Sequence, residues 1–294
     1  MSNPPRKVVI TGALTRDTVQ ALADERGLHL ELSQASGWNG EGLDLLPALS
    51  DAVEHLDIDH ALALDVSMVN TLPRLRSLAL HGAVKGTVAL TSLEGLGLYT
   101  KAGRIRFSGQ PHRLGRLAGA LDSSTLEACA TGGLLQTLIL VKSRLDQLPD
   151  ASLLSQLEQL QLFTVSRLAS IDPALQSGCL QYVRVNGCRE LSITRPVASR
   201  TLKYFALNDC SEIGSLDLLN VTPSLQAVSL LGRTSVGDGR IAHVVRQGYV
   251  KDLRLLPKPS YDITADQLPS DPDLALRLVR EMESAGVHSV GYER

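Results

Sequence analysis

Apolar residues recur along most of the chain in the pattern L-x-x-L-x-L, with Val, Ile or Phe allowed in place of Leu. The final apolar positions of its copies are Ile58, Leu80, Leu98, Leu140, Leu162, Val185, Leu207, Leu230 and Leu255. From position 140 onward they stand 22, 23, 22, 23 and 25 residues apart, and a weak copy at Leu114 and Leu117 falls inside the gap from 98 to 140. Because the end of each copy alternates apolar and other residues, every copy predicts a short strand.

The second half of each unit repeats as well. Apolar positions follow the strand at fixed offsets, as at Cys188 and Leu191, and again at Cys210 and Ile213. The chain thus resembles the leucine-rich repeat family, whose unit is L-x-x-L-x-L-x-x-N/C-x-L, over roughly residues 50 to 256. Cys188 and Cys210 fall on the Asn/Cys position of that unit, whereas other turns carry Ser143, Val165 and Arg233 there.

A single repeat cannot bury its apolar side alone, so the turns must stack. We therefore expect one α/β solenoid over 1–294: a curved leucine-rich repeat array with a parallel sheet on its concave face. Units of 22 to 23 residues leave too little chain for a full helix on every outer side, which predicts extended or 3₁₀ segments there. The expected parts are an N-terminal α/β capping unit (1–45), the repeats (46–256) and a C-terminal helical cap (257–294).

Each cap has its own signals. Near the N-terminus we expect a strand over 7–11, a helix over 15–26 with Thr15 as N-cap, and a strand over 28–33. At the other end, a loop over 257–269 precedes a helix that starts at Pro272, continues through Ser284 and is followed by a final strand over 287–290. Three apolar residues share one face of this helix and are expected to cover the last turn: Leu274, Leu278 and Met282.

The N-terminal strand has two rival interpretations. The run from Lys7 to Ala13 resembles the opening of a Rossmann dehydrogenase, but the further glycines of that fingerprint are missing after Gly12. Continued to Asp17, it also resembles the first strand and helix of a BRCT domain. Neither resemblance extends further, so a capping unit is the favoured interpretation.

The composition of the chain limits the classes of protein and the cellular compartments that fit it. Leucine supplies 54 of the 294 residues, and aromatic residues make up 3%. A net charge of −2 argues against a nucleic-acid binder, and no apolar run is long enough to cross a membrane. Four cysteines suit a reducing cytoplasm, where Cys188 and Cys210 are expected to be buried thiols. The excess of Arg over Lys hints at a bacterial source.

On the predicted sheet, the residues between the leucines face outward. Four of the ten aromatic residues lie there (Tyr99, Phe163, Tyr182 and Tyr204), beside exposed Val141, Leu231 and Leu256. Aromatic and Arg side chains are frequent anchors of protein interfaces. The predicted partner-binding residues are Tyr99, Phe163, Tyr182, Arg184, Asn186, Tyr204, Asn208, Arg254, Arg104 and Arg106.

The same face predicts a second, chemical cluster near the N-terminus. It comprises His29, Glu31, His55, Asp57, Asp59 and His81. Such residues on adjacent strands are able to ligate a divalent metal or transfer protons. This leaves a metal-dependent or hydrolytic enzyme as the alternative function, although solvated polar residues are the more ordinary explanation of an exposed sheet face.

The stretch 101–116 is basic and rich in glycine, and it interrupts the repeat spacing. We interpret it as a flexible basic loop, inserted into the array, that contacts an acidic patch of the partner. The chain contains no nucleophile elbow, phosphate-binding glycine loop or zincin helix, and no cofactor is expected. The expected function is non-catalytic recognition of another protein. We expect the protein to be a monomer when free and to act as an immunity or antitoxin-type inhibitor or as an adaptor.

Overall fold

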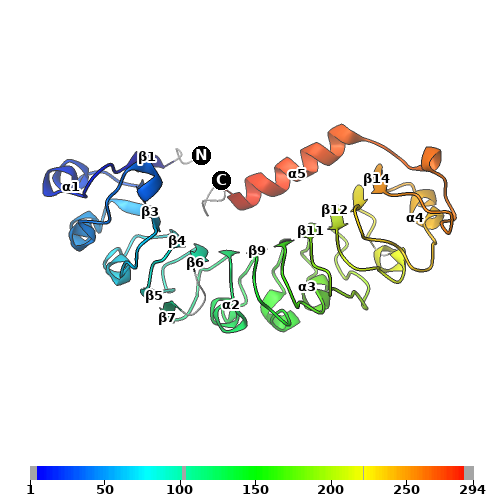
Figure 1. Cartoon of the computed structure of the whole chain (residues 1–294), viewed down its shortest axis with the longest axis horizontal. Coiled ribbons are helices and arrows are strands. Elements are labelled where there is room, and N and C mark those ends of the chain that lie inside the picture. Colours follow the sequence, from blue (N-terminus) through cyan, green and yellow to red (C-terminus); the bar gives the residue numbers. More distant parts are fainter. Residues whose placement is uncertain (1–4, 101–103, 221, 288–294) are drawn as a thin grey trace. The chain divides into compact units, whose positions relative to one another are not determined.

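The computed structural model describes residues 5–100, 104–220 and 222–287, and its chain divides into two compact units. The N-terminal unit extends to Ala120, and the C-terminal unit covers Leu121–Gly286. Figure 1 shows short strands connected by loops and brief helices, with the longer α5 (Pro272–Val287) at the end of the C-terminal unit. In the described residues no helix has the length and apolar character needed to cross a membrane.

The N-terminal unit contains a parallel sheet in the order β1-β2-β3-β4-β6-β8. Its strands are β1 (Arg6–Val9), β2 (Leu28–Ser33), β3 (Val53–His60), β4 (Ser77–Gly82), β6 (Gly95–Thr100) and β8 (Arg116–Gly119). A separate parallel pair joins β5 (Gly86–Ala89) to β7 (Ile105–Ser108). The helices are α1 (Arg16–Leu22) and the 3₁₀ helices η1 (Gln34–Ser36), η2 (Leu43–Leu49) and η3 (Ser67–Thr71).

The C-terminal unit contains the parallel strands β9 to β14, each paired with the next. They are β9 (Thr137–Val141), β10 (Gln159–Phe163), β11 (Tyr182–Asn186), β12 (Tyr204–Asn208), β13 (Ala227–Leu230) and β14 (Asp252–Leu255). Between them lie α2 (Ser123–Ala130), η4 (Ala151–Leu154), α3 (Asp172–Leu175), η5 (Leu216–Leu219) and α4 (Ala242–Arg246), and η6 (Ala265–Gln267) and α5 (Pro272–Val287) follow. The predicted 3₁₀ segments are present as η4 and η5, whereas α2, α3 and α4 are short α-helices that the sequence analysis did not predict.

Repeating leucines fill the interior of both units. Leu56 and Leu78 of the N-terminal unit, and Leu138 and Leu160 of the C-terminal unit, are fully buried, and they occupy equivalent positions of paired strands. Each fully buried leucine contributes about 1.5–3 kcal/mol from removal of apolar surface from water. The stability of the stacked repeats therefore depends on an apolar residue at the same position of each repeat.

Small polar residues hold consecutive turns together. The buried hydroxyl of Ser177 donates to the carbonyl oxygen of Leu157 at 2.8 Å, and that of Ser199 donates to the carbonyl of Leu180 at 2.6 Å. Since a buried carbonyl without a partner is costly, each hydroxyl satisfies a backbone group of the preceding turn. These residues recur with the same period as the leucines.

The chain also adopts a left-handed backbone conformation directly after many strands. Lys142 (φ 50°), Thr164 (φ 55°), Gly187 (φ 71°), Asp209 (φ 52°) and Gly232 (φ 65°) follow β9 to β13 in turn. Residues other than glycine visit this region at a cost of about 1–2 kcal/mol. The turns after β9 to β12 thus leave the sheet by the same backbone geometry, whether or not a glycine is present, and after β13 the left-handed residue stands one position later.

The cap elements lie close to their predicted bounds. Thr15 caps α1 by accepting a hydrogen bond from the backbone nitrogen of Thr18, and β2 covers 28–33 as expected. The loop expected over 257–269 contains the short helix η6. The final strand expected over 287–290 falls largely outside the described residues.

Candidate protein-binding surface

The outward side chains of the C-terminal sheet form three rows that follow from the strand register. The first row, at the amino ends of the strands, is Thr137, Gln159, Tyr182, Tyr204, Ala227 and Asp252. The middle row is Ile139, Gln161, Arg184, Ala206, Ser229 and Arg254. The third row, at the carboxyl ends, contains Val141, Phe163, Asn186 and Asn208, followed in the chain by Leu231 and Leu256.

Helix α5 lies on the first two rows. Its apolar residues Leu274, Leu278 and Met282 form one buried cluster with Tyr182, Tyr204, Ala206 and Ala227 of β11, β12 and β13, and Val279 packs against this cluster. The two tyrosine rings retain only 7% and 8% of their exposure. Figure 1 shows the helix extending back along these strands from the end of the array.

The start of α5 is fixed to the last strand. Asp271 caps the helix by accepting a hydrogen bond from the backbone nitrogen of Leu274 at 3.0 Å. The backbone nitrogen of Asp271 in turn donates to Oδ1 of buried Asp252 at 3.1 Å, and Arg254 pairs with the same carboxylate through Oδ2 at 2.7 Å. Asp252 therefore serves as the anchor of the helix, a role that the sequence alone did not suggest.

Three polar contacts hold the far end of α5. Gln159 donates from Nε2 to the carbonyl oxygen of Met282 at 3.0 Å, and the Tyr182 hydroxyl donates to Oε2 of Glu281 at 3.0 Å. Arg184 lies 3.4 Å from the carboxylate of Glu283. Burial, together with the bond to Glu281, raises the pKa of Tyr182 to about 12. The tyrosine is thus held in the protonated form, which donates in this contact.

The predicted apolar stripe of this helix is present, but the prediction that it covers the last turn is wrong. Leu278 and Met282 do not cover the last turn; with Leu274 they pack on side chains of β11, β12 and β13. The stripe suits this position because one helical turn advances about 5.4 Å, close to the separation of about 4.8 Å between neighbouring strands. Residues four apart lie about 6 Å apart along the helix, so the stripe reaches side chains on several neighbouring strands.

The third row is less covered. Phe163, Asn186 and Asn208 are partly exposed, and Leu256 retains 55% of its exposure. The Arg184 guanidinium lies 5.3 Å from the centre of the Phe163 ring. Asn208 has a structural role as well, since its Oδ1 accepts from the Ser229 hydroxyl and from the backbone nitrogen of Leu231, both at 3.0 Å.

Comparisons with known proteins find similarity in structure but not in sequence. No protein-family model matches the sequence, and no curated protein sequence matches it. Among solved structures, the chain is similar to an internalin from Listeria monocytogenes, with a TM-score of 0.55 and 17% identity over 85% of this chain and 73% of that chain. The chain has the leucine-rich repeat fold. At this level of identity the likeness concerns the fold and transfers no residue role.

In the N-terminal repeats, the predicted chemical cluster is present on adjacent strands, but its carboxylates contact other groups. The Asp57 carboxylate lies 2.8 Å from Nε2 of His29, and Glu31 pairs with Lys7 at 2.7 Å. Asp59 accepts from the Ser33 hydroxyl. Within the described ranges, no group of three or more His, Cys, Asp or Glu side chains is arranged to hold a metal ion.

The rings of this cluster are stacked or crowded together. His81 stacks on Tyr99, with ring centres 4.7 Å apart, and His29 lies 5.9 Å from His55. Burial, reinforced by the charge of His29, lowers the pKa of His55. The patch is thus a network of neighbouring polar groups on a repeat surface, and Tyr99 belongs to it.

The basic stretch is not an inserted loop. Residues 101–103 lie outside the described part of the chain, but the rest forms one more repeat, with β7 and then β8, where Leu114 and Leu117 are buried. Arg104 donates to the carbonyl oxygen of Ala83 at 3.0 Å, whereas the Arg106 side chain is exposed on β7. The weak copy was therefore a true repeat, and Arg104 has a structural contact of its own.

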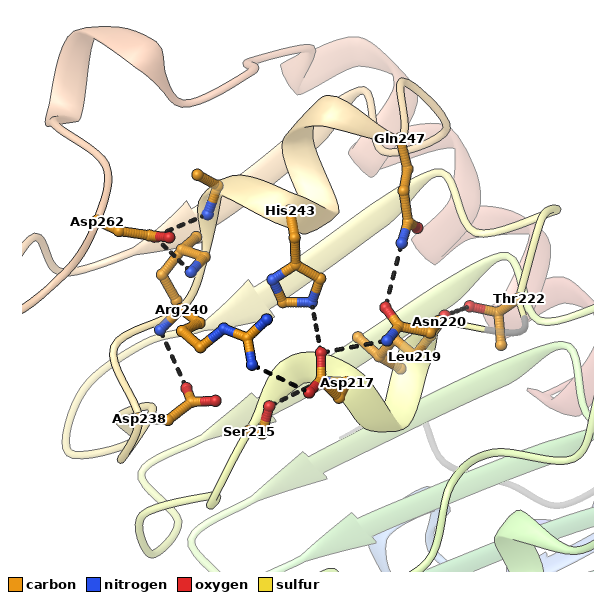
Figure 2. Close-up of polar contacts among 12 residues, drawn as sticks. Ser215, Asp217, Leu219, Asn220, Thr222, Asp238, Arg240, His243, Gln247 and Asp262 are labelled. Carbon is orange, nitrogen blue, oxygen red and sulfur yellow. Dashed lines mark hydrogen bonds and ion pairs between the residues drawn. The ribbon is translucent and has the colours of Figure 1, made fainter.

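A polar cluster on the connecting segments of the last repeats was missed by sequence reasoning (Figure 2). Asp217 lies 3.2 Å from Nε2 of His243 and 3.7 Å from Arg240, and its backbone nitrogen donates to the Ser215 hydroxyl. The order of contacts is Ser–Asp–His, so the histidine does not contact the serine as a general base must. These residues join η5 to α4 of the next turn.

The thiols follow the sequence prediction. Cys188 and Cys210 are buried at the Asn/Cys position, and the Cys210 thiol donates to the carbonyl oxygen of Asn208 at 3.3 Å. Burial raises the pKa of Cys188 to about 11. Buried and protonated, these thiols are part of the repeat interior.

Proposed function

We propose that this leucine-rich repeat protein is a non-catalytic recognition module that binds another protein on the outward face of its sheet. Its action is that of an inhibitor of the immunity or antitoxin type, or of an adaptor, in the cytoplasm of a bacterium. The free protein is a monomer and its partner is not a nucleic acid, in keeping with a net charge of −2.

One observation carries this proposal. The face of β11, β12 and β13 combines two tyrosines with two alanines, and in this chain it already accommodates an amphipathic helix. Aromatic side chains at the centre of a patch with polar groups around it are typical of protein interfaces. The face thus has the chemical character needed to bind a protein, and the partly exposed third row extends it.

The alternative, an enzyme that uses the N-terminal cluster, is less well supported. Asp57 pairs with His29 of the cluster, whereas Glu31 and Asp59 contact Lys7 and Ser33 on neighbouring strands. A metal site needs three or more such ligands around one ion, and the described residues hold no such group. We therefore assign this patch to the surface of the module.

The test compares partner capture by three forms of the full chain. Wild type is expected to retain one major partner from the native host, and Phe163→Ala combined with Asn186→Lys in the third row is expected to lose it. Arg195→Ala, an exposed residue outside the strands, serves as the matched control and should retain the partner. Capture of the same partner by all three forms would contradict the proposal.

A further inference from the structure

The outward face of the C-terminal sheet already has an occupant, which is part of the same chain. Leu278 and Met282 of α5 retain 2% and 0% of their exposure on this face, whereas Leu276 on the other side of the helix retains 49%. The helix is therefore amphipathic with respect to the sheet, and the stripe that it presents has apolar residues at positions i, i+4 and i+8.

The repeats do not need α5 to complete their interior. The inward residues of the covered strands, such as Val183 and Phe205, are fully buried by the stacked turns themselves. The residues beneath α5 are mixed: Gln159, Tyr182 and Asp252 carry polar groups that water is able to solvate, whereas Ala206 and Ala227 are small and apolar. A face of this composition tolerates exposure when the helix leaves it.

The connection also lets the helix leave without disturbing the array. The backbone nitrogen of Leu253 donates to the carbonyl oxygen of Pro269 at 2.9 Å, and Asp271 is held by Asp252. The connecting segment is thus fixed up to the first residue before α5. Beyond that point the helix is held by its apolar stripe and by three side-chain contacts, from Gln159, Tyr182 and Arg184.

Basic side chains of the sheet determine in which orientation a helix binds to this surface. Arg184 faces Glu283, and Lys203 lies with its Nζ 3.4 Å from the Tyr182 hydroxyl that binds Glu281. Two basic side chains thus stand where the carboxyl-terminal half of the helix lies. A helix with acidic residues in that half satisfies both the apolar stripe and these charges.

We propose that the first two rows of this sheet form a helix-binding surface, which α5 occupies in the free protein and which binds an amphipathic helix of the partner in its place. The partner helix has apolar residues at i, i+4 and i+8 and acidic residues in its second half. This inference rests on the proposed function and specifies its partner. Helix α5 is then a built-in competitor: the apparent affinity for the partner is the intrinsic affinity multiplied by the fraction of molecules in which α5 has left the surface.

The test uses the full chain and a labelled synthetic peptide with residues 271–287 as the probe. Leu278→Asp removes the centre of the stripe in the intact protein, and Leu276→Asp is the matched control on the exposed side of the same helix. The peptide is expected to bind the Leu278→Asp chain at least tenfold more tightly than wild type or the control. A peptide that itself carries Leu278→Asp should not bind, and adding Tyr182→Ala with Tyr204→Ala to the chain should abolish binding.

A second measurement does not depend on any variant. With excess peptide, the amide hydrogens of residues 272–284 in the wild-type chain are expected to exchange faster, because the helix is released. Unchanged exchange together with equal peptide affinity for the two Asp variants would overturn the inference. Formation of a dimer by the Leu276→Asp or wild-type chain through exchanged α5 helices would also overturn it, since the occupant would then be a second copy.

The two proposals fail in different ways. If the captured partner is lost in the third-row variant but binds wild type and Leu278→Asp equally, the module recognises a protein without displacing α5. In that case the helix-binding inference is wrong and the recognition function stands. If the partner is kept both by the third-row variant and by the chain with Tyr182→Ala and Tyr204→Ala, the recognition surface itself is wrong.

Discussion

The two units build their sheets in the same way and differ on the outward face. In the N-terminal unit this face carries histidines and carboxylates that pair with one another, such as His29 with Asp57. In the C-terminal unit it carries Tyr182, Tyr204 and Ala206, and a helix covers them. Since inward leucines are shared by both, the repeat pattern determines the fold and the intervening positions determine the chemistry of each surface.

The largest effect is expected from a charge in the shared interior. Leu160 is fully buried between turns of the C-terminal unit, so Leu160→Asp should lower the free energy of unfolding by more than about 4 kcal/mol through an unpaired buried charge. Thermal melting followed by circular dichroism is expected to lose its cooperative transition. Thr164→Asp, at the exposed left-handed position after the same strand, is the control and should melt like wild type.

A smaller effect, confined to one face, is expected from Leu278→Asp. Loss of a buried leucine contact should cost about 2–5 kcal/mol in the docking of α5, while the repeats keep their own interior. Hydrogen exchange is expected to increase in α5 and to stay unchanged in β2, β3 and β4. Faster exchange throughout both units would show that the helix is required for the fold and not only for covering the face.

The sequence was sufficient to predict the repeats because their physics is local and periodic. Leu138, Leu160 and Val183 recur at fixed spacing, and each is buried by the turn next to it. The same logic located Cys188 and Cys210. Residues such as Leu114 and Leu117 were recognised as a weak copy, but the basic residues around them suggested an insertion that the structure does not contain.

What the sequence did not reveal depends on contacts between distant segments. Nothing in the stripe of Leu274, Leu278 and Met282 specifies whether it covers the end of the array or a sheet face. The choice follows from the match of helical pitch to strand spacing and from anchors such as Asp252 and Gln159, which lie many residues away. Gln159 was not among the predicted binding residues, because a buried glutamine has no sequence signature.

Glycines at or just after the ends of strands allow a further comparison of the two units, in which a smaller loss of stability is expected. A Cβ added at Gly82 in the N-terminal unit would lie 2.3 Å from the carbonyl oxygen of His60, whereas at Gly187 in the C-terminal unit the nearest atom, the Thr164 hydroxyl oxygen, is 3.4 Å away. Gly187→Ala should therefore cost about 1–2 kcal/mol from its positive φ alone, and Gly82→Ala clearly more. Urea unfolding of the two variants measures the difference, and equal losses would contradict the steric argument.

The smallest effect is a dependence on pH that belongs to the N-terminal face. Burial lowers the pKa of His55, and the neighbouring His29 lowers it further, against the opposing effects of Glu54 and Asp57. The folded protein thus binds a proton at His55 less readily than the unfolded chain does. The stabilisation from neutral His55 is complete above about pH 6.5 and is lost as the pH falls below that value.

His55→Gln should reduce the decline of the melting temperature between about pH 7 and pH 5, while His112→Gln, at an exposed position, should leave it unchanged. If the melting temperatures of the two variants depend on pH in the same way, the decline does not originate from the neighbouring rings of His29 and His55.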